Sequence, residues 1–271
     1  MQDLFRKNSK AEIYRQLEEL FGHPGTLLFR ARELAVIDDY MARYPLPIEK
    51  RVLDLGCAEG HIGGLLFNRI DVGLDLFPGD LEKTKNSVAY KNAVAADARK
   101  LPFKAQAFDL VFSNSVIEHI PGIEEVLSEV SRVLSDGGFF VFTAPSKLFS
   151  DYLYLTNIFR RTGLSFLGLD KLYSKARNTQ LAHHNLFSDG EWGKFLQGHC
   201  LEVVYSKYYL PEQEIYFWDK ICIFLRLSAP IASLHRMLTK KYNDRVNRII
   251  VSQDKCALGG AVLIVAKRKG R

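Results

Sequence analysis

One stretch of the chain decides the fold: Val52-Leu-Asp-Leu-Gly-Cys-Ala-Glu-Gly-His-Ile-Gly-Gly64. It begins as a short apolar run typical of a buried strand, passes through a turn of small residues and continues with helical spacing. Small residues let the backbone approach a ligand, and a helix N-terminus presents unpaired N–H groups to an anion. The stretch therefore predicts a strand, turn and helix that together hold an anionic small molecule.

Further short apolar runs follow on both sides of helix-length stretches, which predicts parallel strands joined by crossovers. The expected later strands are 71–75, 93–96, 108–112, 138–143, 201–208 and 260–266. A helix ending at Asp136-Gly137-Gly138 should precede the strand that starts at Gly138. We expect an α/β fold with a doubly wound, mostly parallel sheet and helices on both faces.

The remaining segments surround this core as one domain of residues 1–271. Residues 1–46 show helical spacing broken between Gly22 and Gly25. Two insertions, 147–187 and 211–256, interrupt the strand pattern and are too apolar for linkers. We expect them to be helical and to form a cap over the substrate, with Pro230 dividing the second.

The composition excludes several classes of protein. A chain of 271 residues with 47% apolar side chains can fill a core, which excludes a disordered protein. Residues 1–146 carry 17 Lys and Arg against 21 Asp and Glu, whereas 147–271 carry 20 against 10. The basic half suits a phosphate-bearing ligand, an anionic membrane surface or nucleic acid, and charge alone does not choose among them.

The N-terminus has no apolar signal-peptide core, and no apolar run approaches the ~20 residues of a membrane span. The four scattered cysteines lack zinc spacing and are expected to be reduced thiols. We therefore expect a cytoplasmic protein, with peripheral membrane contact as an open alternative.

Acidic and small polar residues follow the expected strands in order. Asp75 ends the second, Asp97 follows the third, and Ser113 and Asn114 follow the fourth. The carboxyl ends of strands in an open α/β sheet are where ligands bind, and an acid after the second strand can accept both hydroxyls of a ribose. The alternative, in which these residues are only turns and helix caps, fits any one of them but not the ordered set.

As a set, these motifs resemble the class I S-adenosylmethionine-dependent methyltransferases, in particular the broad small-molecule group that includes quinone-biosynthesis enzymes. The resemblance covers residues 50–146 well, and also rests on Phe108-Asp-Leu-Val-Phe-Ser-Asn-Ser-Val-Ile-Glu-His-Ile120 and Val133-Leu-Ser-Asp-Gly-Gly-Phe139. It implies a Rossmann-like sheet of seven strands with the last antiparallel, and S-adenosylmethionine as cofactor. The cofactor-binding residues that it implies are Asp54, Gly56, Cys57, Ala58, Gly60, Asp75, Leu76, Asp97, Ala98, Ser113 and Asn114.

Within this resemblance, Asp54 should hold the methionine end, Asp75 the ribose and Asp97 the adenine, with Ser113 and Asn114 beside the methyl group. Ala58 stands where the family usually has a second glycine, which is tolerable if its φ stays negative. On the N-terminal helix, Arg30 and Arg32 are candidates for neutralising the methionine carboxylate, against the alternative of exposed helix-face arginines.

Methyl transfer requires alignment and water exclusion, and a base only when the acceptor must lose a proton. The candidate catalytic residues are His119, His183 and His184, with Glu118 beside the first. No metal site is expected, because Ser115 stands where related O-methyltransferases place the first acidic ligand. Structural roles remain open for all of these residues.

Other readings stay open. A nicotinamide-dependent oxidoreductase shares the Asp75 pattern, but Gly56, Gly60 and Gly63 do not give its glycine spacing. A nucleic-acid methyltransferase would fit the basic half, although Ser113-Asn-Ser-Val116 replaces that class's usual tetrad. A non-catalytic cofactor-binding module is the third alternative. We expect a small-molecule acceptor that is amphiphilic, phosphate-bearing or lipid-linked, and the sequence is silent on oligomeric state.

Overall fold

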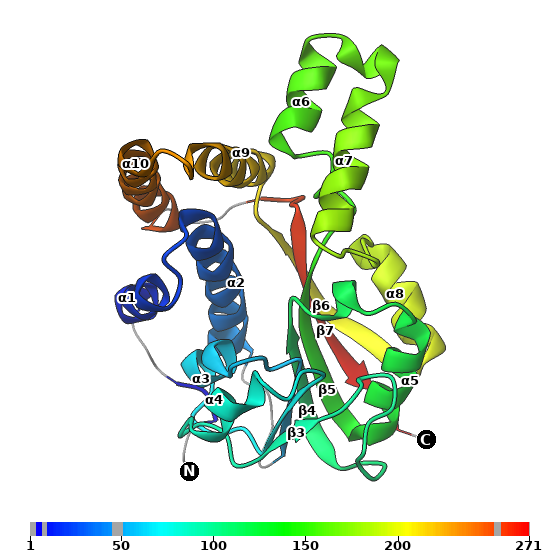
Figure 1. The fold of residues 1–271 in the computed structure, drawn as a ribbon. Helices are drawn as coiled ribbons and strands as arrows, with labels where there is room; N and C mark the ends of the chain where they lie inside the picture. Colours follow the sequence, from blue (N-terminus) through cyan, green and yellow to red (C-terminus); the bar gives the residue numbers. More distant parts are fainter. Residues whose placement is uncertain (1–3, 7–9, 45–50, 252–255, 271) are drawn as a thin grey trace.

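The computed structural model describes residues 4–6, 10–44, 51–251 and 256–270, arranged as a central sheet with helices on both sides and a helical hairpin that rises from it (Figure 1). The strands are β1 (Val52–Leu55), β2 (Val72–Asp75), β3 (Ala93–Ala95), β4 (Phe108–Asn114), β5 (Leu134–Pro145), β6 (Leu201–Tyr209) and β7 (Ala261–Arg268). Their order is β3-β2-β1-β4-β5-β7-β6, and only the pairs made by β7 are antiparallel. The expected doubly wound sheet with an antiparallel last strand is confirmed.

The helices fill the crossovers and both insertions. They are α1 (Lys10–Leu20), α2 (Pro24–Arg43), α3 (His61–Leu66), α4 (Leu81–Lys85), η1 (Ile117–His119), α5 (Ile123–Val133), α6 (Tyr154–Arg161), η2 (Leu164–Leu167), α7 (Leu169–Gln180), α8 (Asp189–Gly198), α9 (Glu212–Ser228) and α10 (Ala232–Val251). The break before α2 has a local cause, because the His23 ring nitrogen Nδ1 accepts from the Gly25 amide at 3.1 Å and Pro24 occupies the first helical position.

The boundary between α5 and β5 differs from the expected one. The helix ends at Val133, and β5 begins at Leu134 rather than at Gly138. Leu134 pairs with Phe108 before a register shift restores regular pairing at Phe139. Gly137 and Gly138 indicated a turn between the helix and the strand. In the structure they lie inside the irregular first part of β5.

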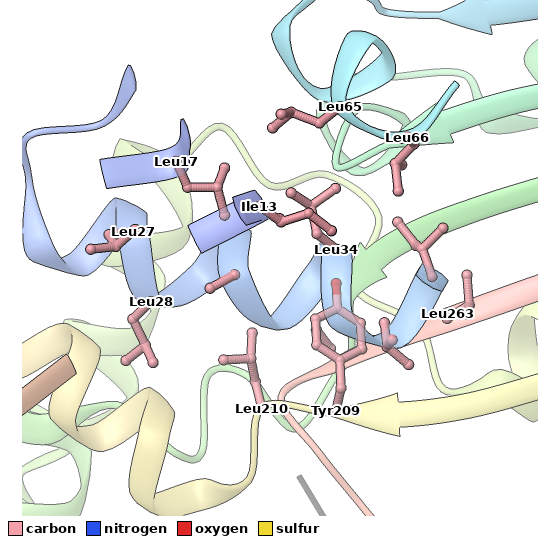
Figure 2. Close-up of a cluster of buried hydrophobic side chains, with 14 of the residues drawn as sticks. Ile13, Leu17, Leu27, Leu28, Leu34, Leu65, Leu66, Tyr209, Leu210 and Leu263 are labelled. Atoms are coloured by element: carbon pink, nitrogen blue, oxygen red, sulfur yellow. The ribbon is translucent and has the colours of Figure 1, made fainter. Parts of the chain in front are cut away.

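Two apolar cores cover the two faces of the sheet, because alternate residues of each strand point to opposite sides. On β4, Leu110 and Phe112 join the core under α1, α2, α9 and α10, whereas Val111 joins the core under α5 and α8. Figure 2 shows the first of these cores, where Leu34 of α2 lies close to Tyr209 at the end of β6. This core fixes α2 beside the carboxyl ends of the central strands.

The two insertions pack differently. Helices α6 and α7 form the hairpin that extends from the body in Figure 1. Helices α9 and α10, separated around Pro230 as expected, pack against α2. Residues 1–3, 7–9 and 45–46 of the expected N-terminal segment, and residues 252–255 of the second insertion, lie outside the described residues.

Candidate functional site

A cavity of about 570 Å³ opens at the carboxyl ends of β1, β2 and β4, within the range of roughly 300–1,000 Å³ usual for small-molecule sites. Of the sequence-predicted site residues, the structure brings ten to its wall: Asp54, Gly56, Cys57, Ala58, Asp75, Leu76, Asp97, Ala98, Asn114 and His119. Four others, Gly60, Ser113, His183 and His184, do not line it.

The glycine-rich turn after β1 has a backbone that side chains would obstruct. Gly56 has a φ of 79°, and a Cβ there would come within 2.4 Å of Val116. Ala58 also has a positive φ, 44°, so the condition under which a side chain there was expected to be tolerable, a negative φ, is not met. Two hydrogen bonds hold it there: its amide donates to Asp75 Oδ2 at 2.8 Å, and its carbonyl accepts from Thr84 Oγ1 at 2.6 Å.

Gly60 and Gly63 leave space for the Tyr90 side chain, which packs directly against both of them. A Cβ on Gly60 would lie 3.0 Å from the Tyr90 ring, and one on Gly63 would lie 2.1 Å from the Tyr90 hydroxyl. Gly73 on β2 is equally close to that ring, at 2.8 Å. Tyr90 was not predicted, because nothing local in its segment signals that three distant glycines make room for it.

Tyr90 contacts the most deeply placed acid of the cavity. Its hydroxyl donates to Asp54 Oδ2 at 2.5 Å, and the Asp54 side chain is buried. Burial raises the pKa of Asp54 to about 7, and the Tyr90 hydrogen bond partly opposes this rise. Because burial and the Tyr90 hydrogen bond act in opposite directions on its pKa, Asp54 can ionise and pair strongly with a cationic group that enters the cavity.

Asp75 is held rigidly at the end of β2. Its two carboxylate oxygens accept from the amides of Ala58 and Phe77, at 2.8 and 3.0 Å. Each oxygen retains a further lone pair that can accept from a hydroxyl group. The structure therefore gives Asp75 the fixed geometry that ribose binding requires, and the ribose role stays a prediction.

The outer part of the cavity is apolar on one side and charged on the other. Leu76 and Phe77 remain 57% and 64% exposed although both line the cavity, so they can cover a flat ring. Asp97 is paired with Arg99 at 2.7 Å, and that pair lowers the pKa of Asp97. Phe77 and Arg99 were not predicted, although both stand next to predicted residues.

The inner wall contains a hydrogen-bonded network that joins β4 to α2. Asn114 Nδ2 donates to Glu33 Oε2 at 3.2 Å, and the Ser115 hydroxyl donates to Glu33 Oε1. The expectation for Ser113 is not met, because its buried hydroxyl donates to the Leu55 carbonyl at 2.9 Å and turns away from the cavity. The buried Glu33, which the sequence did not single out, therefore fixes the polar end of β4.

The two candidate arginines of α2 have separate roles. Arg30 lines the cavity and pairs with Glu33 at 2.6 Å. Arg32 is buried on another face of the helix, where its Nε donates to Glu214 of α9 at 2.9 Å. Neither is an exposed helix-face arginine, and only Arg30 is placed to contact a ligand carboxylate.

Of the three candidate histidines, only His119 lines the cavity. Its Nδ1 lies 3.2 Å from the Ala182 carbonyl oxygen, an acceptor, so Nδ1 carries the proton. The His183 ring packs at a tilt against the His119 ring, with the ring centroids 5.5 Å apart. Burial lowers the pKa of His183 to about 4. His184 is exposed, and its amide donates to the Glu118 carbonyl.

Glu118 itself is buried next to this site. Burial raises the pKa of its carboxyl group to about 8, and its Oε2 has no hydrogen-bond partner within the described residues. Asn185, also buried, donates to the carbonyls of Ile117 and Ile120 at 2.7 and 2.8 Å. These bonds attach the segment after α7 to η1, beside the cavity.

Across the described part of the chain, no three His, Cys, Asp or Glu side chains are grouped to hold a metal ion.

Part of the chain is similar in sequence to known proteins. A family model described as a methyltransferase domain matches residues 53–142. A malonyl-[acyl-carrier protein] O-methyltransferase from Legionella pneumophila is 37% identical over 101 residues, which are 35% of this chain and 36% of that protein. A trans-aconitate 2-methyltransferase from Methylobacterium nodulans is 33% identical over 117 residues, 41% of this chain and 44% of the other. The chain thus spans less than half the length of these curated relatives.

The fold agrees over a longer stretch. The crystal structure of a SAM-dependent methyltransferase from Thermotoga maritima superimposes with a TM-score of 0.53 at 16% identity, over 94% of this chain and all of that one. At this identity the likeness concerns the fold alone. Residues 53–142 thus match a methyltransferase domain, and the chain has the fold of the class I S-adenosylmethionine-dependent methyltransferases.

Proposed function

We propose that the protein transfers a methyl group from S-adenosylmethionine to a small-molecule acceptor. The observation that carries this proposal is the placement of Asp54, Asp75 and Asp97 in one cavity, each at or just after the end of its strand. S-adenosylmethionine supplies the methyl group on a positively charged sulfur. The three carboxylates offer partners for an ammonium group, a ribose and an adenine amino group, in that order across the sheet.

The chain's own residues would bind and orient rather than react. Asp54 holds a cationic group, Asp75 fixes a sugar, and Leu76 with Phe77 covers an aromatic ring and excludes water. In neutral His119 the unprotonated nitrogen is Nε2, which lies 3.6 Å from Glu118 Oε1. His119 is therefore the candidate that could accept a proton from the acceptor, at the Nε2 that also faces Glu118, while the Ala182 carbonyl holds Nδ1.

The acceptor is proposed to be amphiphilic and to be taken from a membrane surface. The outer end of the α6–α7 hairpin exposes Phe166 (82%) and Leu167 (58%), and the corner between α9 and α10 exposes Leu227 (71%) and Ile231 (55%). Both regions lie in the upper half of Figure 1. No helix in the described ranges is long and apolar enough to span a bilayer, so contact would be peripheral.

Exposed basic residues support an anionic surface as the partner. Lys240 and Lys241 of α10 are exposed and follow the apolar corner, and a lysine near an anionic membrane contributes about 1 kcal/mol. The two curated relatives bear names that specify different acceptors, so the matched segment does not select the acceptor. We expect the two insertions, which lie outside that segment, to determine which acceptor is bound.

Two measurements test the proposal. Calorimetry with S-adenosylmethionine and its demethylated product should give one site each, and labelled methyl groups should enter an organic-soluble fraction of cell extract. Flotation with vesicles of phosphatidylcholine and phosphatidylserine should carry the protein at low salt, and less so with the Lys240→Ser/Lys241→Ser variant. Absence of cofactor binding contradicts the methyltransferase proposal. A protein that stays behind with every lipid mixture contradicts only the membrane part.

A further inference from the structure

A second cavity, of about 560 Å³, lies along the hairpin formed by α6 and α7. We call it the hairpin groove; its lining residues are Ser150, Asp151, Arg160, Lys171, Ser174, Lys175, Asn178, Thr179 and His183. Arg160 and Lys171 belong to the outer ends of the two helices, and Ser150 and His183 lie next to their inner ends. The lining residues thus extend from the outer end of the hairpin to its base. Figure 1 shows the two helices of this hairpin.

The charge of the groove is positive. Three of its side chains, Arg160, Lys171 and Lys175, are cationic, and Asp151 supplies the single carboxylate. That carboxylate is already engaged, because it accepts from Arg160 Nη2 at 2.7 Å. Lys171 and Lys175, one turn apart on α7, have no ion pair within the described part of the chain. Two ammonium groups therefore face this groove without an anionic partner.

The floor of the groove offers neutral hydrogen-bond donors. Ser174 donates its hydroxyl to the Ser150 carbonyl at 3.2 Å, and Asn178 Nδ2 donates to Ser150 Oγ at 2.8 Å. These bonds hold three polar side chains in one place, and both hydroxyl groups can reorient toward an anion. Cations above a floor of hydroxyl and amide groups suit the oxygens of a phosphate.

The inner end of the groove reaches the cofactor cavity. His183 lines the groove, whereas its neighbour Ala182 lines the cavity. The His183 ring packs at a tilt against His119, which also lines the cavity. The two cavities are therefore neighbours at this pair of imidazole rings, since one ring lines each of them.

We propose that the hairpin groove binds the phosphate or diphosphate group of the methyl acceptor, so that the remainder of the acceptor reaches the cofactor past His183 and His119. This proposal rests on the methyltransferase function proposed above and adds the chemical class of the acceptor. It also gives a role to His183, which does not line the cofactor cavity: the ring closes the inner end of the phosphate site.

Inorganic pyrophosphate is the probe for this site. Calorimetry at low salt, with and without S-adenosylmethionine, should show one pyrophosphate per chain. The Lys171→Ala/Lys175→Ala variant should bind it at least about tenfold more weakly, because two charge-assisted contacts are lost. The matched control is Lys104→Ala/Lys194→Ala, which removes two exposed lysines distant from the groove and should change the affinity less than about twofold.

Histidine resonances give a second readout that general attraction to lysine would not affect. Pyrophosphate should shift the NMR signals of His183 and leave those of His199, which pairs with Glu124, in place. Equal affinity in the groove variant and the parent, or an unmoved His183 signal, overturns the proposal. Cofactor binding is measured on the same samples, so loss of the methyltransferase function would be visible separately.

The source of the phosphate group is distinguished with vesicles of phosphatidylcholine with and without phosphatidic acid. If the acceptor is lipid-linked, the groove variant floats less than the control with the acidic vesicles. If the acceptor is soluble, the variant loses pyrophosphate binding and floats as the control does.

Discussion

The Tyr90 hydroxyl lies 2.5 Å from Asp54 Oδ2, and the ring that carries it occupies space left by three glycines. This contact connects the segment before β3 to the carboxyl group of β1 at the base of the cavity. It makes Tyr90 a positioning residue for the acid proposed to hold the cationic end of the cofactor.

Tyr90→Phe should weaken cofactor binding and move its pH dependence upward. In the parent, affinity for a cationic group should rise as pH increases through about 7, because Asp54 then ionises. The Tyr90 hydrogen bond favours ionised Asp54, so its loss raises the pKa and shifts the rise to higher pH. Calorimetry between about pH 6 and 9 measures this. Tyr205→Phe is the control, and coinciding pH profiles of the parent and Tyr90→Phe would refute the assignment.

Asp75→Asn should weaken cofactor binding by about tenfold to a hundredfold, since a charged acceptor contributes roughly 1.5–3 kcal/mol. Asparagine is preferred to alanine because its single amide oxygen can still accept from one of the Ala58 and Phe77 amides, both of which the carboxylate holds. The control is Asp80→Asn, which lines the same cavity and should change the affinity less than about threefold. Similar losses in both variants would indicate a general charge effect and remove the ribose role.

Glu118→Gln should stabilise the protein at high pH. Burial raises the Glu118 pKa from 4.5 to about 8, so the folded state keeps a proton that the unfolded chain releases. Stability is therefore lost progressively as pH rises from about 4.5 to about 8, and a neutral amide avoids this loss. Thermal unfolding at about pH 5 and pH 8 should show a gain over the parent that is larger at pH 8. The control Glu125→Gln, at an exposed position, should show no such gain. An equal gain from Glu118→Gln at both pH values would contradict a raised Glu118 pKa as the cause.

Arg32→Met should destabilise the protein by about 3–5 kcal/mol, because it removes the buried guanidinium that pairs with the Glu214 carboxylate. The double variant Arg32→Met/Glu214→Leu should recover most of that loss, since apolar residues pack there without a charge. Urea unfolding measures both. If the double variant is as unstable as the sum of the single variants, the ion pair is not the cause.

The sheet could be predicted because its information is local. Short apolar runs and the helix-length stretches between them can be recognised without knowledge of tertiary contacts, and each of the seven strands forms at one of these runs. The cavity acids could be predicted for the same reason, since each directly ends or follows a strand.

The errors arose where a partner lies far along the sequence. The positive φ of Ala58 depends on Asp75 and Thr84, and the position of Arg32 depends on Glu214, 182 residues away. Glu33 gave no signal, because an acid on a helix is usually solvated. Its contact with Ser115 exists only once α2 packs beside β4.

The position of β7 has a consequence for how the chain is made. This strand, 261–268, lies between β5 and β6, both of which are synthesised earlier. Until β7 has left the ribosome, β5 presents an open edge of backbone groups, and β6 has no strand to join. The sheet can therefore close only after β7 has been made, and during that interval the nascent chain is a client for chaperones that shield exposed strand edges.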